Sequence, residues 1–302
     1  MRKGFIESDV TDQSGKTIVI TGANTGLGYE AARVLSAKGA RVIIACRSQQ
    51  KAEDAIARIE KENGRVDVSH VALDLGDLSS VSNCADQLQS EDKIDILINN
   101  AGIMVPPYEL TTDGFESQFG VNHLGPFALT GLLLDKLAAA PAPRVVNTSS
   151  MAHHRGKIYF GDINAENGYR AMPRYAMSKL ANLLFTYELQ RRLEASGQHT
   201  LSVACHPGIA DTELSRYIPA LLNMLTPLMK PLFNTAASGA WPTLCAATSD
   251  DISGGDYIGP AKRRETAGPA VKVRSNRASR DQDVAQRLWD LSIQMTGVDP
   301  GI

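Results

Sequence analysis

Several features that would assign a protein to a specialised class are missing from this sequence. It has only four cysteines, at positions 46, 84, 205 and 245, and they show none of the CxxC or Cys/His clustering that a zinc or redox site needs. We therefore expect four buried or half-buried thiols, no metal site and a reducing compartment.

The chain also lacks a strong charge of either sign. Its 31 basic residues nearly balance its 33 acidic residues, which leaves a formal charge of −2. This balance gives no electrostatic reason to expect DNA, RNA or an anionic membrane as a partner. The composition is compatible with a small ligand that is neutral or carries phosphate.

Long apolar runs and linkers are absent too. Residues 1–15 form a polar leader, with acids and hydroxyls where a signal peptide would need an apolar segment, and no other stretch approaches the length of a membrane span. We expect a cytoplasmic protein without a membrane anchor. Because no repeat or Pro/Gly/Ser linker divides the chain, we treat residues 1–302 as one domain although the length would permit two.

What the sequence does contain is a regular alternation of apolar strands and helices. Strands that are apolar throughout and separated by helices predict a parallel sheet covered on both faces. The expected fold is α/β, a single doubly wound Rossmann-type domain with about seven strands. The predicted strands are 16–20, 41–46, 66–73, 94–99, 144–150 and 200–208, and the predicted helices are 28–39, 48–63, 77–90, 112–139, one that includes 173–185, and 283–295.

A glycine-rich turn, "TGANTGLG" at 21–28, lies between the first predicted strand and helix. In that context Gly22, Gly26 and Gly28 would let the backbone approach a pyrophosphate at a helix N-terminus. The spacing is GxxxGxG and differs from the commoner GxGxxG, so the turn taken alone is equally compatible with a structural role.

The residues after the second predicted strand indicate whether the cofactor is NAD(H) or NADP(H). An acid roughly 20 residues after the turn would accept hydrogen bonds from the ribose of NAD, and none is there. The strand ends in Cys46, Arg47 and Ser48, and a guanidinium can bind a 2′-phosphate with two hydrogen bonds. NADP(H) is therefore favoured over NAD(H), and the alternative is that Arg47 is an ordinary solvated residue.

Further motifs follow in order along the chain. They are "NNAG" at 99–102, Asn122, the pair Ser149 and Ser150, Tyr-x-x-x-Lys at 175–179, and "HPG" at 206–208. Together with the glycine-rich turn they resemble the short-chain dehydrogenase/reductase family over residues 15–260. The sequences around 144–158, 175–189 and 206–214 most resemble its branch of retinol dehydrogenases, WW-domain oxidoreductase and protochlorophyllide reductase.

The resemblance implies a role for each matching position. Ser150 would be the catalytic hydroxyl and Ser149 structural, while Asn122 would hold a water that links Lys179 to solvent. The implied catalytic residues are Asn122, Ser150, Tyr175 and Lys179. The implied cofactor-binding residues are Gly22, Asn24, Thr25, Gly26, Leu27, Gly28, Arg47, Asp74, Leu75, Asn100, Ala101, Gly102, Tyr175, Lys179, Pro207, Gly208 and Thr212.

Tyr175 and Lys179 have the spacing that places two side chains on one face of a helix. Alone, such a pair most often covers apolar surface. A phenol has a pKa of about 10, so a neighbouring ammonium would favour the phenolate and help Tyr175 to exchange a proton near neutrality. Pro173 suits the first turn of the helix and would place Tyr175 near its positive end.

Three segments lie outside these motifs. Ser150 and Tyr175 are 25 positions apart, roughly twice the spacing of compact family members, so His153, His154, Tyr159 and Tyr169 of the 153–172 insertion could border the substrate. Adjacent histidines in a polar loop are more often solvated.

Residues 209–233 would form an apolar substrate lid or pack on a partner subunit, and homo-oligomer formation is possible. The C-terminal extension, 261–302, would end in a helix that docks Leu288, Trp289 and Ile293.

The leading hypothesis is an NADP(H)-dependent oxidoreductase that transfers a hydride between nicotinamide and an apolar alcohol, aldehyde or ketone. A binding protein that senses the cofactor is an alternative, although it would usually have lost a catalytic residue. An epimerase or dehydratase is a third reading, but the roughly 90 residues after Gly208 are few for the larger substrate region that such enzymes use.

Overall fold

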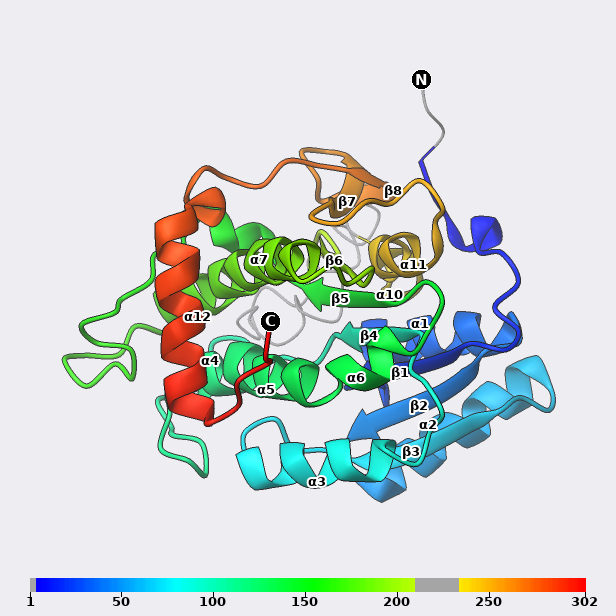
Figure 1. Ribbon diagram of the computed structural model, residues 1–302. Helices are drawn as coiled ribbons and strands as arrows, with labels where there is room; N and C mark the ends of the chain where they lie inside the picture. Colours follow the sequence, from blue (N-terminus) through cyan, green and yellow to red (C-terminus); the bar gives the residue numbers. More distant parts are fainter. Residues whose placement is uncertain (1–3, 210–233) are drawn as a thin grey trace, which may run out of the picture.

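A computed structural model describes residues 4–209 and 234–302, and its centre is one eight-stranded sheet (Figure 1). The strand order is β3-β2-β1-β4-β5-β6-β7-β8, parallel from β3 to β7, with β8 antiparallel to β7. The strands are β1 Thr17–Thr21, β2 Arg41–Cys46, β3 Val68–Ala72, β4 Ile96–Asn99, β5 Arg144–Thr148, β6 Leu201–Cys205, β7 Tyr257–Lys262 and β8 Ala267–Lys272.

The eighth strand corrects the expected number of about seven. β8 has the sequence "AGPAVK". Its glycine and proline are unusual inside a strand, so the sequence contains no apolar run that would predict this strand. It lies at the edge of the sheet, where a proline is tolerated. There Ala270 pairs with Phe5, which places part of the N-terminal segment against β8.

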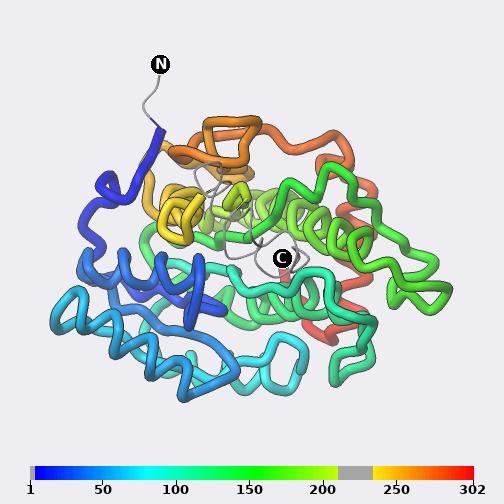
Figure 2. The backbone as a smooth tube through the Cα atoms, turned by 180° about the vertical axis from the view of Figure 1, so that it is seen from behind, coloured from blue at the N-terminus to red at the C-terminus, as the bar shows by residue number. Residues whose placement is uncertain are grey.

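Helices cover both faces of the sheet, as the apolar strands predict. Ile18 and Ile20 of β1 face one core, whereas Val19 between them faces the other. The first core packs against α1 (Gly26–Ala37), α2 (Gln49–Asn63) and α11 (Trp241–Thr248), which Figure 2 shows together on one side of the molecule. The second packs against α3 (Leu78–Leu88), α5 (Gly125–Leu132), α6 (Leu134–Ala138) and α7 (Ala171–Ala195).

The C-terminal helix α12 (Gln282–Thr296) packs against α7 and runs across it in the view of Figure 1. Trp289 and Ile293 pack into the second core, and Leu288 is buried in a neighbouring cluster with residues of α7, which confirms the docking residues predicted from the sequence. The remaining described elements are short: the 3-10 turns η1 Glu7–Asp9, η3 Met151–Arg155 and η6 Ala278–Arg280, and the helices α4 Ser117–Phe119 and α10 Ala236–Gly239.

The long helix predicted over 112–139 is wrong in three respects. Residues 112–116 are not helical, and α4 begins only after Glu116, whose carboxylate accepts hydrogen bonds from the amides of Gln118 and Phe119. Next comes a π-helical turn, Gly120–Leu124, and a break at Leu133 separates α5 from α6. Apolar periodicity does not distinguish a π-turn from an α-turn, which is why the sequence indicated one helix.

The structure also bears on the predicted state of the cysteines and on the search for membrane-spanning helices. All four cysteines are buried and unpaired, as predicted. Within residues 4–209 and 234–302, no helix combines the length and the apolar character needed to cross a bilayer.

Candidate active site

The glycine-rich turn connects β1 to α1 and fits tightly against the end of β4. Gly22 and Gly26 have φ values of 67° and 60°, which favour glycine. A Cβ atom at Gly28 would lie 2.5 Å from Asn100 Nδ2 and 2.8 Å from Gly22 O, and one at Gly22 would lie 2.9 Å from the Ala101 side chain. All three glycines are therefore required by this backbone path.

The N-terminus of α1 is open to an anion. Its N-cap residue is Thr25, whose side chain makes no capping hydrogen bond, whereas α2 and α3 are capped by Ser48 and Asp77. Thr25 is exposed, and Asn24 and Leu27 are half-buried beside it. Uncapped amides at a helix N-terminus next to a glycine turn suit a pyrophosphate.

Thr21, at the end of β1, ties this turn to the end of β4. Its Oγ1 accepts hydrogen bonds from the amides of Asn100 and Ala101, at 3.0 and 2.9 Å, and its carbonyl accepts one from Asn100 Nδ2 at 2.9 Å. Asn100 and Ala101 therefore lie beside the glycine-rich turn.

Arg47 follows β2 and reaches into solvent. Its side chain is 74% exposed, and Nη1 lies 3.8 Å from Asp74 Oδ2. Asp74 follows β3, and its Oδ1 accepts a hydrogen bond from the Gly76 amide at 2.9 Å. Leu75 is buried in the core, so only its backbone is available to a ligand. Exposure leaves the guanidinium able to meet a phosphate.

Tyr175 and Lys179 lie one turn apart on α7 and are both buried. Lys179 Nζ donates a hydrogen bond to Thr148 O at the end of β5, 3.2 Å away, and lies 5.7 Å from the centre of the Tyr175 ring. Ser149 is buried and donates to Lys179 O at 2.8 Å. The pair is thus part of the junction between α7 and β5 and is not a surface pair.

Ser150 is half-buried at the same strand end. Its Oγ accepts a hydrogen bond from the Ala152 amide at 3.2 Å and caps the short turn η3. Because the hydroxyl acts as an acceptor there, its own hydrogen is left to donate elsewhere. Ser150 thus follows the same strand end, β5, to which Lys179 is hydrogen-bonded through Thr148 O.

Asn122 lies in the π-helical turn and holds the strand end of β4 against α7. Its Oδ1 accepts from the Ile103 amide at 2.8 Å, and its Nδ2 donates to Ile103 O and to Ser178 Oγ, both at 2.9 Å. Gly102 completes this corner, because a Cβ atom there would lie 3.0 Å from Asn122 Oδ1 and 3.3 Å from Lys179 Nζ. π-turns often occur at functional sites.

Pro207 and Gly208 form a buried turn after β6. Gly208 has a φ of 76°, and a Cβ atom there would lie 2.4 Å from Thr266 O, so this position requires glycine. Thr212 and residues 210–233 of the predicted lid lie outside the described residues.

The 153–172 insertion differs from the expectation of two solvated histidines. His153 is buried and only His154 is exposed. Tyr169 accepts a hydrogen bond from Gln118 Nε2 at 2.9 Å and donates one to Pro106 O at 2.8 Å, which joins the insertion to the loop after β4. Tyr159 is exposed.

Sequence reasoning missed two contributors to this arrangement. Ser178 receives the hydrogen bond from Asn122 and donates one to Tyr175 O at 2.9 Å, and its place directly before Lys179 was the available signal. His206 begins the "HPG" motif and accepts a hydrogen bond from Gly208 of the same motif, but its other partner, Glu265, belongs to no motif.

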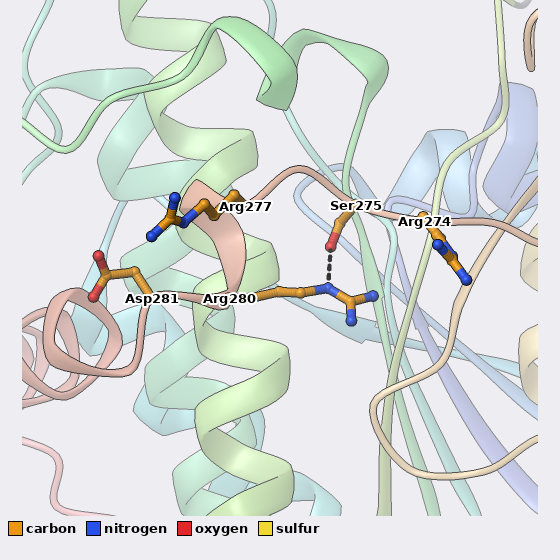
Figure 3. Close-up of a pocket in the computed structure, with 5 residues that line it drawn as sticks. All are labelled: Arg274, Ser275, Arg277, Arg280 and Asp281. Atoms are coloured by element: carbon orange, nitrogen blue, oxygen red, sulfur yellow. Dashed lines mark hydrogen bonds between the residues drawn. The ribbon is translucent and has the colours of Figure 1, made fainter.

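A cavity of about 610 Å³ lies elsewhere, between β8 and α12 (Figure 3). It is lined by Arg274, Ser275, Arg277, Arg280 and Asp281, and Arg280 Nε donates to Ser275 Oγ at 3.3 Å. None of the predicted catalytic residues lines the cavity, and Ser275 contacts Tyr187, which is about 18 Å along α7 from Tyr175 at 1.5 Å per residue.

The doubly wound sheet and the glycine-rich turn after its first strand fit a nicotinamide-dependent oxidoreductase, and sequence comparison agrees. The short chain dehydrogenase family matches residues 16–221, and the chain belongs to that family. Its members are oxidoreductases that bind a nicotinamide cofactor.

Particular relatives are similar over most of the chain. Retinol dehydrogenase 12 of Mus musculus and of Homo sapiens are each 44% identical over 287 residues, which cover 94% of this chain and 87% of theirs. An uncharacterized protein from Mycobacterium paratuberculosis has a similar structure, with a TM-score of 0.83 and 42% identity over 99% of this chain and 100% of that one. A short chain dehydrogenase from Shigella flexneri complexed with NADP shares the fold, with a TM-score of 0.62 and 23% identity over 82% of this chain and 97% of that one.

Proposed function

We propose that this protein is an NADP(H)-dependent oxidoreductase that interconverts an apolar alcohol and its aldehyde or ketone, with Tyr175 as general acid and base. The observation that carries the proposal is the buried junction of Tyr175 and Lys179 with the end of β5. The similarity to retinol dehydrogenases supports an apolar substrate.

Reduction of a carbonyl needs a hydride on carbon and a proton on oxygen, and the nicotinamide supplies the hydride when bound. In our proposal Ser150 donates a hydrogen bond to the carbonyl oxygen and Tyr175 transfers its proton to that oxygen. Lys179 lies close enough to stabilise the tyrosinate that this transfer leaves. Alcohol oxidation reverses these steps.

The residues present also fit the cofactor. The turn at Gly22, Gly26 and Gly28 and the uncapped N-terminus of α1 would hold the pyrophosphate. Asn100 and Ala101 would stand near the ribose, and Pro207 and Gly208 near the nicotinamide. The exposed guanidinium of Arg47 would bind the 2′-phosphate, which supports NADP(H) over NAD(H). A cytoplasmic location remains part of the proposal.

The test is a substrate screen with purified protein. Loss of reduced-nicotinamide absorbance is followed with NADPH, and separately with NADH, against straight-chain aldehydes, ketones and all-trans-retinal. We expect turnover of apolar carbonyl compounds and tighter binding of NADPH. Tight NADPH binding without oxidation by any carbonyl compound would instead favour a protein that senses the cofactor.

A further inference from the structure

The hydrogen bonds of His153 assign its tautomer and connect it to Ser150. His153 Nδ1 lies 2.6 Å from Ser150 O, and a carbonyl can only accept, so Nδ1 carries the proton. The other nitrogen, Nε2, then accepts from the Asn276 amide at 3.4 Å. Burial lowers the pKa of His153 to about 4, which agrees with a neutral ring. The ring thus holds the backbone of Ser150 at the end of β5.

His206 has the opposite tautomer and holds the next strand end. The Gly208 amide donates to His206 Nδ1 at 3.2 Å, so the proton is on Nε2, which donates to Glu265 Oε2 at 3.1 Å. The histidine is fully buried, and a Cβ atom at Gly259 would lie 2.0 Å from Nε2, so glycine is needed there to make room. The ring therefore connects Glu265 to the Pro207–Gly208 turn.

Glu265 belongs to an unusual hairpin turn between β7 and β8. Arg263, Arg264 and Glu265 have φ values of 54°, 56° and 67° in succession, although left-handed residues other than glycine normally occur singly. Such a conformation persists only where its surroundings impose it. The Ile209 amide donates to Thr266 O at 3.0 Å, so this turn is bonded to the residue that follows Gly208.

Asn276 makes the corresponding contact with His153. Its Nδ2 donates to His153 O at 3.1 Å, and its Oδ1 accepts from the Ser279 amide at 3.0 Å. The preceding residue, Ser275, lies 2.8 Å from Tyr187 Oη of α7 and lines the cavity in Figure 3. This anchoring to α7 fixes the position from which Asn276 holds His153.

Tyr257, at the start of β7, separates the two histidines. Its ring centre lies 5.5 Å from that of His153 and 5.2 Å from that of His206. Throughout the part of the chain that the structure describes, no group of three or more His, Cys, Asp or Glu residues is arranged to hold a metal ion. The histidines are therefore organised by packing and hydrogen bonds.

We propose that Glu265 and Asn276 position the active site: Glu265 holds the Pro207–Gly208 turn through His206, and Asn276 holds Ser150 through His153. The inference rests on the proposed function, which gives these two turns their roles toward the nicotinamide and the carbonyl group. It predicts that the two connections affect different steps. Loss of the Glu265 connection weakens cofactor binding, whereas loss of the His153 connection slows turnover.

The first test compares Glu265→Ala with Glu265→Gln. The glutamine keeps an oxygen that accepts from His206, while the alanine removes it. We expect the Kd for NADPH, measured by fluorescence titration, to rise about tenfold in Glu265→Ala and to stay within about threefold in Glu265→Gln. Arg264→Ala, an exposed neighbour in the same turn, is the matched control and should leave the Kd unchanged.

The second test compares His153→Leu with His153→Asn. Asparagine can still donate from Nδ2 to Ser150 O, whereas leucine cannot. We expect kcat for an aldehyde that the wild type reduces to fall about tenfold in His153→Leu and to recover largely in His153→Asn, with the NADPH Kd within about twofold in both variants.

The pattern across these variants decides the matter. The positioning role would be overturned if Glu265→Ala and Glu265→Gln weakened NADPH binding equally. It would also be overturned if Kd, kcat and the melting temperature all changed together in both pairs of variants. A Glu265→Ala variant that binds NADPH like the wild type would overturn it as well. If the wild type bound no nicotinamide nucleotide, the proposed function itself would fail, so the two failures are distinguishable.

Discussion

The buried His123 should make the stability of the protein depend on pH between 7 and 5. It lies in the π-helical turn next to Asn122, fully inside a group of rings from Phe119, Phe127 and Phe185. Burial lowers its pKa to about 3, against a reference value of about 6.5 for an unfolded chain. The unfolded state therefore binds a proton in this range that the folded state does not, and stability falls as the pH falls.

The size of the effect follows from these two values. Proton linkage gives a loss of about 2 kcal/mol in the free energy of unfolding between pH 7 and pH 5 from this one residue. His153, with a pKa of about 4, contributes a further loss of similar size. Other groups titrate as well, so the difference between wild type and a His123 variant is the quantity to measure.

The assay is urea unfolding of the wild type and of His123→Leu at pH 7, 6 and 5. Leucine fills a similar volume, and Ser292, the hydrogen-bond partner of His123 Nε2, keeps its bond to Leu288 O. We expect the wild type to lose about 2 kcal/mol more than the variant across this range. The control is His199→Gln at an exposed position, because this variant should lose as much free energy of unfolding between pH 7 and pH 5 as the wild type does. If the free energy of unfolding changed equally with pH in the wild type and in His123→Leu, the reasoning would be refuted.

Three further outcomes are expected. Arg47→Ala should raise the Kd for NADPH about 10- to 100-fold and leave that for NADH unchanged; an equal effect on both would contradict a 2′-phosphate contact. Gly28→Ala should weaken NADPH binding at least tenfold because its Cβ would meet Asn100 Nδ2 and backbone, whereas Gly161→Ala, with open space around it, should bind normally. Ser178→Ala should cost about 1 kcal/mol of stability in thermal unfolding and lower kcat severalfold; unchanged kcat would exclude a positioning role.

The sequence predicted the architecture well where apolar character is concentrated in short runs. The strands at Thr17–Thr21 and Arg41–Cys46 are buried on both faces, and such strands leave an unmistakable pattern. Neither β7 nor β8 is among the six predicted strands, because each contains a glycine and a proline, which are typical of turns. The pairing of β8 depends on β7 and on Phe5, which are contacts that local pattern does not encode.

Motif spacing was equally informative for the central part of the candidate site. Tyr175 and Lys179 meet the end of β5 because i, i+4 spacing on a helix and the carboxyl end of a parallel strand are simple geometric rules. The role of the Tyr-x-x-x-Lys pair in proton transfer stays a prediction. The same holds for the cofactor contacts assigned to the glycine-rich turn and to Arg47.

Residues that act through long-range contacts were beyond the reach of the sequence. His153 was expected to be solvated because its neighbours in the chain are polar, yet Asn276, more than a hundred positions later, buries it. Glu265 reaches His206 in the same way across a hairpin turn. Such pairs have no fixed spacing, so only the folded arrangement of β6, β7 and β8 reveals them.

The most direct test of hydride transfer with Tyr175 as proton donor is a comparison of wild type with Tyr175→Phe. The change removes only the hydroxyl, so NADPH should bind with a Kd within about threefold of the wild type. Removal of the general acid should lower kcat for an apolar aldehyde about 100- to 10,000-fold. Wild-type turnover by Tyr175→Phe, with NADPH bound normally, would contradict the account.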